Sequence, residues 1–431
     1  MEKNTFLKIT FILLGISSLI GWNAVLSTFS YFSVKFGPRV FNGFTAPLQV
    51  GQCLFGVIMP WLATKLSLLT RIAGGLTILS ILLVFLPILA SIAPSDMVTI
   101  DDELQYSNNA GYYIALVMTF FIGAFNSIAQ NSMIALAAQQ AGEINGLYWI
   151  ATGLSGLSTA VLSLILNAAF HSMGDKGQYI ATIIFFVFAS LTSFTAIFLT
   201  YLMIKKYPAP HEQQEYDHED FDQDKKGLVS ETMESDISEN QMLKADDEAS
   251  FMDKIKIAFT HVRFIPVFIF LIYLTTFTLF PGVMMNNVEF KGSYLSKDAQ
   301  LWGTQFLNVT YQIGDVLGKT IGGNPIFHKV KGQYIAVLAR LGFIATSLLV
   351  VFQQGAFFSN DWFPFVNMLL FATTNGFCTA GLMSLGPQKG QGKQKVIETI
   401  GFICGFALTF GIAMGSVTAI PFAEIVKLHT Q

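Results

Sequence analysis

Long apolar segments recur along the whole chain and constrain its fold more than any other feature. There are about eleven, each of roughly 20 residues or more, which is the length that a hydrocarbon core of about 30 Å requires of a helix. Lipid offers the backbone no water to bond, so segments of this kind must be helical. The predicted spans are 6–33, 43–66, 70–93, 111–138, 144–170, 178–204, 262–285, 300–323, 333–353, 362–385 and 397–422. The sequence therefore predicts an all-α polytopic membrane protein.

The composition supports a membrane protein and argues against an enzyme or a metal site. Only 12% of the residues are charged, about half of the roughly 25% typical of soluble domains. Cys53, Cys378 and Cys404 all fall within predicted spans, so we expect neither a disulfide framework nor a metal site. The sequence contains no phosphate-binding loop, zinc pattern or nucleophile motif. We therefore expect no enzyme activity, no ATP drive and no cofactor.

A long polar segment separates the first six predicted spans from the last five. Residues 207–256 hold 15 of the 28 acidic residues of the chain. A segment this acidic and this poor in aliphatic residues cannot bury enough apolar surface to order itself. We predict an N-terminal six-helix bundle (1–206), a disordered acidic linker (207–256) and a C-terminal five-helix bundle (257–431).

The placement of lysine and arginine predicts the orientation, because cytoplasmic loops are enriched in both. With a cytoplasmic N-terminus, the inner loops and their flanks carry eleven of these residues, and the outer loops carry six. This orientation places the acidic linker in the cytoplasm and the C-terminus outside the cell. We expect the plasma membrane in preference to an internal membrane.

The eighth predicted span is the only one with two opposite charges near its middle. A charge at the centre of a spanning helix costs roughly 2.5–3.5 kcal/mol, so such residues usually line a cavity. Asp315 and Lys319 are four residues apart and share one helix face, which Asn308 and Gln312 extend. The pair could also be a buried ion pair that locks two helices together. The uncharged polar residues on the same face favour a wall of a substrate cavity.

The fourth predicted span contains a run of polar residues from Asn126 to Ser132. Asn126 and Gln130 share one face, and Ser127 and Asn131 share the adjacent face. Amides in a membrane helix must find partners in protein or in a wet cavity, and their donors and acceptors suit the edge of a nucleobase. The alternative is packing between helices through hydrogen bonds of about 0.6 kcal/mol each. Gln130 is our candidate for function because it lies near the middle of the membrane.

Trp22 and Asn23 mark the first predicted span. Tryptophan is commonest at membrane interfaces, but Trp22 lies deeper than an anchoring role requires. Its indole could stack on a planar ligand, or it could be a core residue bonded to a neighbouring helix. The adjacent Asn23 favours a cavity.

Taken in order, these motifs resemble the equilibrative nucleoside transporter family over most of the chain. No single motif decides the resemblance, which rests on their order, their positions in the spans and the six-plus-five layout. The matching positions are Gly21-Trp22-Asn23, Phe125 to Ser132, Gly153, Phe280-Pro281-Gly282, Gly314 to Lys319, Arg340, Asn375-Gly376, Gly386 to Lys389 and the glycines of the last span.

The resemblance implies a fold like that of major facilitator transporters, with two helical bundles around a central site. It implies facilitated transport of nucleosides and sometimes nucleobases by a monomer in the lipid bilayer, with no nucleic-acid partner. By the same resemblance, Gln130 would bond the base, and Leu19 and Trp22 would face it. Asp315 would accept from the ribose hydroxyls with help from Lys319, and Gln312 stands where the family often has an amide.

This sequence departs from the family pattern at two positions. Lys319 stands where relatives commonly have arginine, so a point charge replaces a rigid fork of donors. Asn126 stands where many relatives have glycine, which would crowd the cavity there. Both departures bear on affinity and selectivity.

From the chemistry of the predicted site we expect alternating access and weaker transport of deoxynucleosides, because buried polar groups left unpaired are costly. Nucleotides should be poor substrates, since the stripe holds one cation and no arginine cluster for phosphate. The main alternative is a proton-coupled nucleoside or nucleobase symporter in which Asp315 carries the proton. A sugar carrier of the major facilitator type is disfavoured by the loop at 64–71, and a receptor or membrane enzyme by the number of spans and the scattered histidines.

Overall fold

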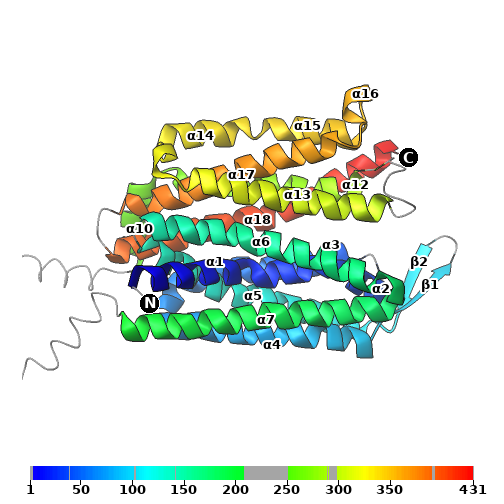
Figure 1. Cartoon of the computed structure of the whole chain (residues 1–431), viewed down its shortest axis with the longest axis horizontal. Helices are drawn as coiled ribbons and strands as arrows, with labels where there is room; N and C mark the ends of the chain where they lie inside the picture. The colour runs from blue at the N-terminus through cyan, green and yellow to red at the C-terminus, as the bar shows by residue number, and fades with distance from the viewer. Residues whose placement is uncertain are drawn as a thin grey trace, which may run out of the picture.

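The computed structural model is a bundle of long helices that run side by side, with the two chain ends at opposite ends of the molecule (Figure 1). It describes residues 3–37, 39–100, 103–140, 142–207, 251–288, 290, 299–390 and 394–430. The predicted linker lies almost wholly outside these residues. Among them, ten helices are long and apolar enough to cross a membrane. A further helix, α13, spans 24 residues and contains the polar stripe.

In the part of the first half that the structure describes there are seven helices, two of them joined by a short 3-10 turn at His171–Met173. They are α1 (Lys3–Ser27), α2 (Phe29–Phe36), α3 (Val40–Ala63), α4 (Leu68–Ile92), α5 (Ala110–Ala138), α6 (Gly142–Phe170) and α7 (Gly174–Lys206).

The described residues of the second half form nine helical segments, together with a π-helical turn η2 (Thr278–Val283) and a 3-10 turn η4 (Pro325–Phe327). They are α10 (Phe251–Val262), α11 (Ile265–Phe277), α12 (Met284–Asn287), α13 (Ala299–Gly322), α14 (Val330–Ala339), α15 (Gly342–Val351), α16 (Gly355–Phe358), α17 (Phe363–Gln388) and α18 (Gln394–Thr430).

Three of the predicted spans are interrupted in the structure. The first ends at Ser27 and restarts as α2 after Thr28. The span predicted at 262–285 loses helical geometry at Phe280 (φ −131°, ψ 126°), next to Pro281, which has no N–H to continue the helix. The span predicted at 333–353 divides into α14 and α15 at Arg340, whose side chain is buried.

A short β-hairpin projects beyond the helices at the end that contains α2 and α12 (Figure 1). Strands β1 (Asp96–Ile100) and β2 (Glu103–Ser107) pair antiparallel, which the all-α prediction did not include. Arg39 holds the base of the hairpin: its Nη2 donates to Ser95 Oγ at 2.8 Å and to Asn109 Oδ1 at 2.7 Å. Its guanidinium lies 3.9 Å from the ring centroids of both Tyr106 and Tyr112.

The packing of α13 against α17 decides which way the polar stripe faces. Gly314, Gly318 and Gly322 are spaced four residues apart, and a side chain at any of them would collide with the α17 backbone. Such small residues let two membrane helices approach closely. With this face against α17, the stripe faces α6 and the centre of the molecule.

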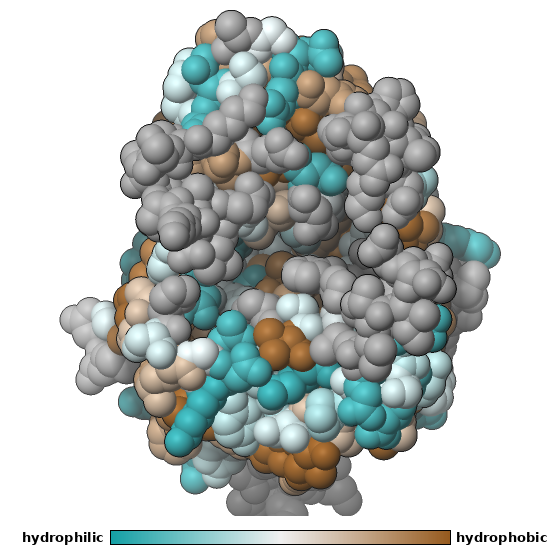
Figure 2. All heavy atoms as spheres, turned by 90° about the vertical axis from the view of Figure 1, so that its right-hand side faces the viewer, coloured by the Kyte–Doolittle hydropathy of each residue, from teal (hydrophilic) through white to brown (hydrophobic). Residues whose placement is uncertain are grey.

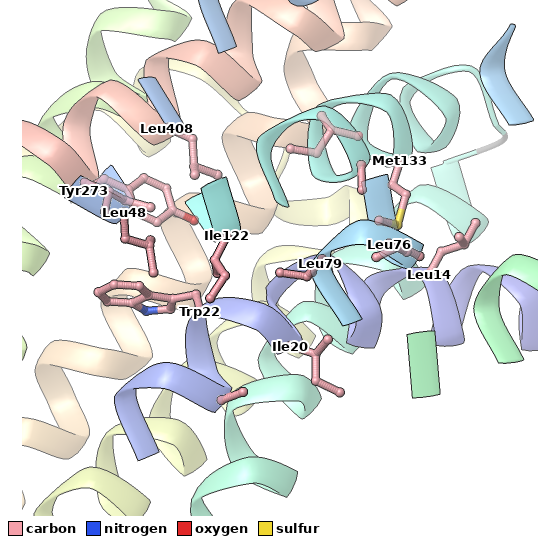
Figure 3. Packing of buried hydrophobic residues seen from close by; sticks show 14 of the residues in the cluster. Leu14, Ile20, Trp22, Leu48, Leu76, Leu79, Ile122, Met133, Tyr273 and Leu408 are labelled. Atoms are coloured by element: carbon pink, nitrogen blue, oxygen red, sulfur yellow. The ribbon is translucent and has the colours of Figure 1, made fainter. Parts of the chain in front are cut away.

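A large cluster of buried apolar residues joins the two halves. In Figure 3, Trp22 and Leu48 from the first half lie near Tyr273 and Leu408 from the second half. The contacts between halves run mainly through α13 with α6 and through α18 with α3 and α5. The central space is therefore bounded by helices from both halves of the chain.

Candidate functional site

All seven residues predicted for the site line one cavity between the two halves of the chain. Its empty volume is about 960 Å³. The predicted residues on its wall are Leu19, Trp22, Asn23, Gln130, Gln312, Asp315 and Lys319. They come from α1, α5 and α13, so segments distant in sequence converge as the polar patterns indicated.

The α13 side of the cavity holds the buried ion pair. Lys319 Nζ lies 2.7 Å from Asp315 Oδ2, and both residues are buried. Lys319 also donates to Thr152 Oγ1 on α6 at 2.9 Å. On the other side, Asn375 Nδ2 on α17 donates to Asp315 Oδ1 at 2.8 Å. The pair therefore lies on the cavity wall and also ties α13 to two neighbouring helices.

Uncharged polar groups continue this wall along α13. Gln312 Nε2 lies 3.4 Å from Asn308 Oδ1, and both residues line the cavity. Gly156 on α6 leaves the space that the Gln312 amide occupies, since a side chain at that position would collide with it. The wall is thus shaped by a glycine on the facing helix.

The opposite side of the cavity combines an amide with aromatic rings. Asn126 Nδ2 lies 3.4 Å from the Oε1 of Gln130, and Asn23 Nδ2 donates to Ser155 Oγ at 3.3 Å. The ring centroids of Trp22 and Phe277 are 5.8 Å apart. Trp22 therefore packs in the core and also lines the cavity.

A second aromatic pair lies at the interruption after α11. The rings of Phe280 and Tyr311 stack at 3.9 Å with an interplanar angle of 11°, and both residues line the cavity. Planar side chains therefore border the cavity from α1, α11, η2 and α13, which suits a flat ligand.

Several polar residues on the wall were not among the predicted site residues, including Gln49, Gln52 and Asn375. Both side-chain polar atoms of Gln49 are buried with no hydrogen-bond partner among the described residues. Gln49 and Gln52 are two amides three residues apart in one span, which is the signal that identified the run on α5.

Most of the α5 run does not reach the cavity. Asn126, Ser127, Asn131 and Ser132 are buried but absent from its lining. Ser127 Oγ donates to Gln52 O at 2.8 Å, and Asn131 Nδ2 donates to Ser127 O at 2.9 Å. Of these residues only Ser127 bonds to another described helix, and the other contacts lie within α5. Within the described part of the run, only Gln130 lines the cavity.

The two ends of the cavity differ. Towards the end that contains the N-terminus, the halves are joined by the ion pair of Arg71 on α4 with Glu398 on α18, at 3.5 Å. Towards the hairpin end, the lining extends to Ser27, Gln49 and Pro281. Figure 2 shows the hairpin end, on which hydrophilic and hydrophobic residues are interspersed.

A family model described as "Nucleoside transporter" matches residues 116–423, which is more than half of the chain. The chain belongs to the nucleoside transporter family. It is a transporter of this family and not an enzyme, and nucleosides are the substrate class that the family implies.

Two members of the nucleoside transporter family illustrate how far the similarity extends. "Equilibrative nucleoside transporter 1" of Homo sapiens is 25% identical over 477 residues, covering 96% of each chain. "Equilibrative nucleotide transporter 4" of Arabidopsis thaliana is 24% identical over 418 residues, covering 94% of this chain and 92% of its own. The similarity therefore runs from end to end.

Comparison with a solved structure confirms the fold of this protein. The major facilitator superfamily proton:xylose symporter XylE, bound to 6-bromo-6-deoxy-D-glucose, superposes with a TM-score of 0.62 at 13% identity. The match covers 99% of this chain and 91% of the symporter. The prediction of a polytopic helical membrane protein with a major-facilitator-like fold is confirmed.

Proposed function

We propose that this protein is a facilitative carrier that moves nucleosides, and nucleobases as a second substrate class, through its central cavity by alternating access. One observation carries the proposal: a carboxylate–ammonium pair on one wall of the cavity faces an amide and an indole contributed by the other half of the chain. These groups are complementary to the two ends of a nucleoside.

In this proposal the ribose binds at α13. Among the described residues, each oxygen of Asp315 has one polar partner, Asn375 for Oδ1 and Lys319 for Oδ2. A carboxylate offers about four lone-pair positions, so both oxygens can still accept a hydroxyl. The vicinal hydroxyls of ribose fit this arrangement, and a sugar that lacks one of them would make one hydrogen bond fewer to the charged carboxylate.

The base binds towards α1 and α5. Gln130 can hydrogen-bond the edge of the base, while Leu19 and Trp22 can contact its face and Asn23 borders the same region. Gln312 lies between this region and Asp315 on the wall, where it can contact either part of the substrate. Gln49, with two unpartnered polar atoms, is a further candidate for contact with the base.

The arrangement of the two halves supports alternating access. The cavity lies between them, and transporter sites commonly occupy such an interface near the middle of the membrane. The contacts of α6 with α13 and of α4 with α18 join the halves on the N-terminal side of the cavity. Breaking these contacts while closing the hairpin end would expose the cavity to the opposite side.

We further propose that the protein acts as a monomer in the plasma membrane, with the N-terminus in the cytoplasm and the C-terminus outside. The distribution of lysine and arginine supports this orientation, and the chain ends at opposite ends of the molecule agree with an odd number of spans (Figure 1). In this orientation the hairpin is extracellular.

The test is uptake of radiolabelled adenosine and uridine, as one purine and one pyrimidine nucleoside, into cells that lack nucleoside transport. We expect saturable uptake that ignores an imposed proton gradient. Cells that carry the empty vector set the background, and surface labelling confirms that the protein reaches the membrane. Absence of uptake despite surface expression would overturn the substrate assignment.

The same experiment decides the second candidate, a proton-coupled nucleoside symporter. Asp315 favours it because this carboxylate is buried and lines the cavity, as a proton-carrying group would. Uptake that rises with an inward proton gradient and collapses with an uncoupler would replace the facilitative mechanism with symport.

A further inference from the structure

Arg340 is the largest side chain that is fully buried in the described part of the chain, with 1% of its surface exposed. It lies at the division between α14 and α15, outside the lining of the cavity. None of the ion pairs among the described residues includes it. A charge at this depth is costly and usually has a functional role.

The guanidinium of Arg340 is held by neutral groups on two helices. Nη1 donates to Ile272 O at 3.2 Å and Nη2 to Thr276 Oγ1 at 2.9 Å, both on α11. Nε donates to Thr374 Oγ1 on α17 at 3.3 Å. The guanidinium carbon lies 5.0 Å from the ring centroid of Phe371. Its direction is therefore fixed by partners on several sides.

Asn375 lies between Arg340 and Asp315 and forms hydrogen bonds with both side chains. The Oδ1 of Asn375 accepts from Arg340 Nη2 at 3.4 Å and from Thr276 Oγ1 at 2.8 Å, whose single hydroxyl proton is shared with Ile272 O of its own helix at 2.7 Å. An amide has one acceptor end and one donor end, so these two donors direct its Nδ2 away from Arg340. That Nδ2 donates to Asp315 Oδ1 at 2.8 Å.

We propose that Arg340 is a positioning residue for Asp315 and acts through Thr276 and Asn375. Together they fix the amide of Asn375 with its donor end towards the cavity, and this donor holds one carboxylate oxygen while Lys319 holds the other. The plane of the carboxylate is thereby set for two hydroxyl groups at once. The inference rests on the proposed function, and it identifies what makes the site selective for an intact ribose diol.

Thr276 is the residue of choice for the test, because it is buried and does not line the cavity. Thr276→Val removes the hydroxyl that connects Arg340 with Asn375 and changes the shape of the side chain little. Thr275→Val is the matched control: it is the same change on the same helix at a buried site. The Thr275 hydroxyl donates to Leu271 O of its own helix at 2.9 Å.

The readout is selectivity for the diol, which a general loss of stability would not change. In the full-length protein, inhibition of labelled adenosine uptake is measured with adenosine, 2′-deoxyadenosine and 3′-deoxyadenosine. For the wild type we expect the deoxy analogues to bind about tenfold more weakly or worse, as the loss of a hydrogen bond to a charged group predicts. Thr276→Val should reduce this ratio at least about threefold, and Thr275→Val should leave it unchanged.

Arg340→Gln and Arg340→Lys form the second arm. The Lys variant keeps the positive charge but loses the planar set of guanidinium donors. It should therefore retain part of the selectivity for adenosine over its deoxy analogues that the Gln variant loses. Unchanged ratios in Thr276→Val, or equal losses in Thr276→Val and Thr275→Val, would overturn this inference while adenosine uptake by the wild type still upheld the proposed function. Absence of wild-type uptake would overturn both.

Discussion

Helices α5 and α13 both contain a run of polar residues in the middle of the membrane, yet the two runs are used differently. On α13, Asn308, Gln312, Asp315 and Lys319 all line the cavity. On α5, Gln130 alone among the described residues of the run does so. Polar content therefore identifies a helix that matters, and the packing of its neighbours decides which of its residues face the substrate.

The spacing of the two runs explains the difference. The stripe on α13 keeps to one face, and its glycine face lies against α17. The run on α5 occupies two adjacent faces, and so it cannot all face one cavity. Among its remaining members, Ser132 Oγ bonds within α5, to Ile128 O at 2.8 Å, and Ser127 bonds to the α3 backbone. The predictions below test this division between substrate contacts and packing contacts.

The largest effect should come from Asp315→Asn on α13. The change replaces one of the two acceptor oxygens for the ribose by an NH2 donor. It also leaves Lys319 without its charge partner, and breaking a buried pair in this way costs about 3–5 kcal/mol. Uptake of adenosine should fall by about two orders of magnitude. Uptake per molecule at the cell surface is the measurement, and a thermal unfolding scan in detergent reports the accompanying loss of stability.

Asp175→Asn is the control for that experiment, since Asp175 is exposed in the first turn of α7. It removes the same charge far from the cavity and should leave uptake unchanged. If Asp315→Asn retained wild-type uptake, the polar stripe on α13 would hold packing contacts like most of the run on α5, and the comparison would fail.

A pair of neighbouring substitutions on α5 tests the division within one helix. Gln130→Ala should weaken apparent affinity for nucleosides about tenfold, because one hydrogen bond to the base is lost. Asn131→Ala should leave affinity unchanged and lower the stability by about 1–3 kcal/mol, since the buried partners of its amide lose a donor. Concentration-dependent uptake and thermal unfolding are measured for both variants.

The opposite pattern would be decisive for α5. A loss of affinity in Asn131→Ala equal to that in Gln130→Ala would mean that the whole run contacts the substrate, directly or through water.

The sequence predicted much of the fold and the cavity, for a physical reason. Buried polar groups in a membrane are expensive, so Asp315, Lys319 and Gln130 could be singled out without knowledge of any contact. Spacing placed them on faces, and all seven predicted residues do line one cavity. Their roles in binding remain predictions.

What the sequence did not predict depends on contacts between distant segments. Asn375 is eight residues from Asn367, the other asparagine of its span, so no run of amides marks it. Its importance lies in its partners on α11, α13 and α14–α15. The division at Arg340 and the interruption at Phe280 leave the hydropathy of their spans unchanged, so a search for apolar segments passes over them. The hairpin at 96–107 carries no spanning signal at all, and it is fixed by Arg39 from another loop.

A smaller effect is expected where α6 meets α13. Gly156→Ala would place a methyl group against the Gln312 amide, so this cavity residue must move. We expect apparent affinity to fall about three- to tenfold, the effect of a displaced hydrogen-bonding group. The measurement is concentration-dependent uptake of adenosine and uridine.

Gly74→Ala on α4 is the matched control, because no atom lies within 4 Å of the added methyl group. It should leave transport unchanged and raise stability slightly, as alanine stabilises a helix by about 1 kcal/mol relative to glycine. Equal affinities for Gly156→Ala and the wild type would show that Gln312 is not held by α6 and has room to move.

The smallest effect concerns the end of α13, which is tied to α17 by His328. This residue lies between η4 and α14, outside the spanning helices. Its Nε2 is 3.2 Å from Gly322 O and its Nδ1 is 3.1 Å from Gln388 Nε2. A neutral ring satisfies both contacts, with Nε2–H donating and Nδ1 accepting. Burial lowers the pKa of His328.

A lowered pKa makes the tie sensitive to acid. Its contribution to stability is complete above the usual histidine pKa of about 6.5 and is lost as pH falls from that value through the lower pKa of the folded protein. Between about pH 7.5 and about pH 5.5 the wild type should therefore lose roughly 1–2 °C more in Tm than His328→Gln. The Gln variant keeps an amide at the position and does not titrate. A matching decline in both proteins would show that the charge on His328 leaves the α13–α17 contact unaffected, and that the end of α13 is held by its glycine packing alone.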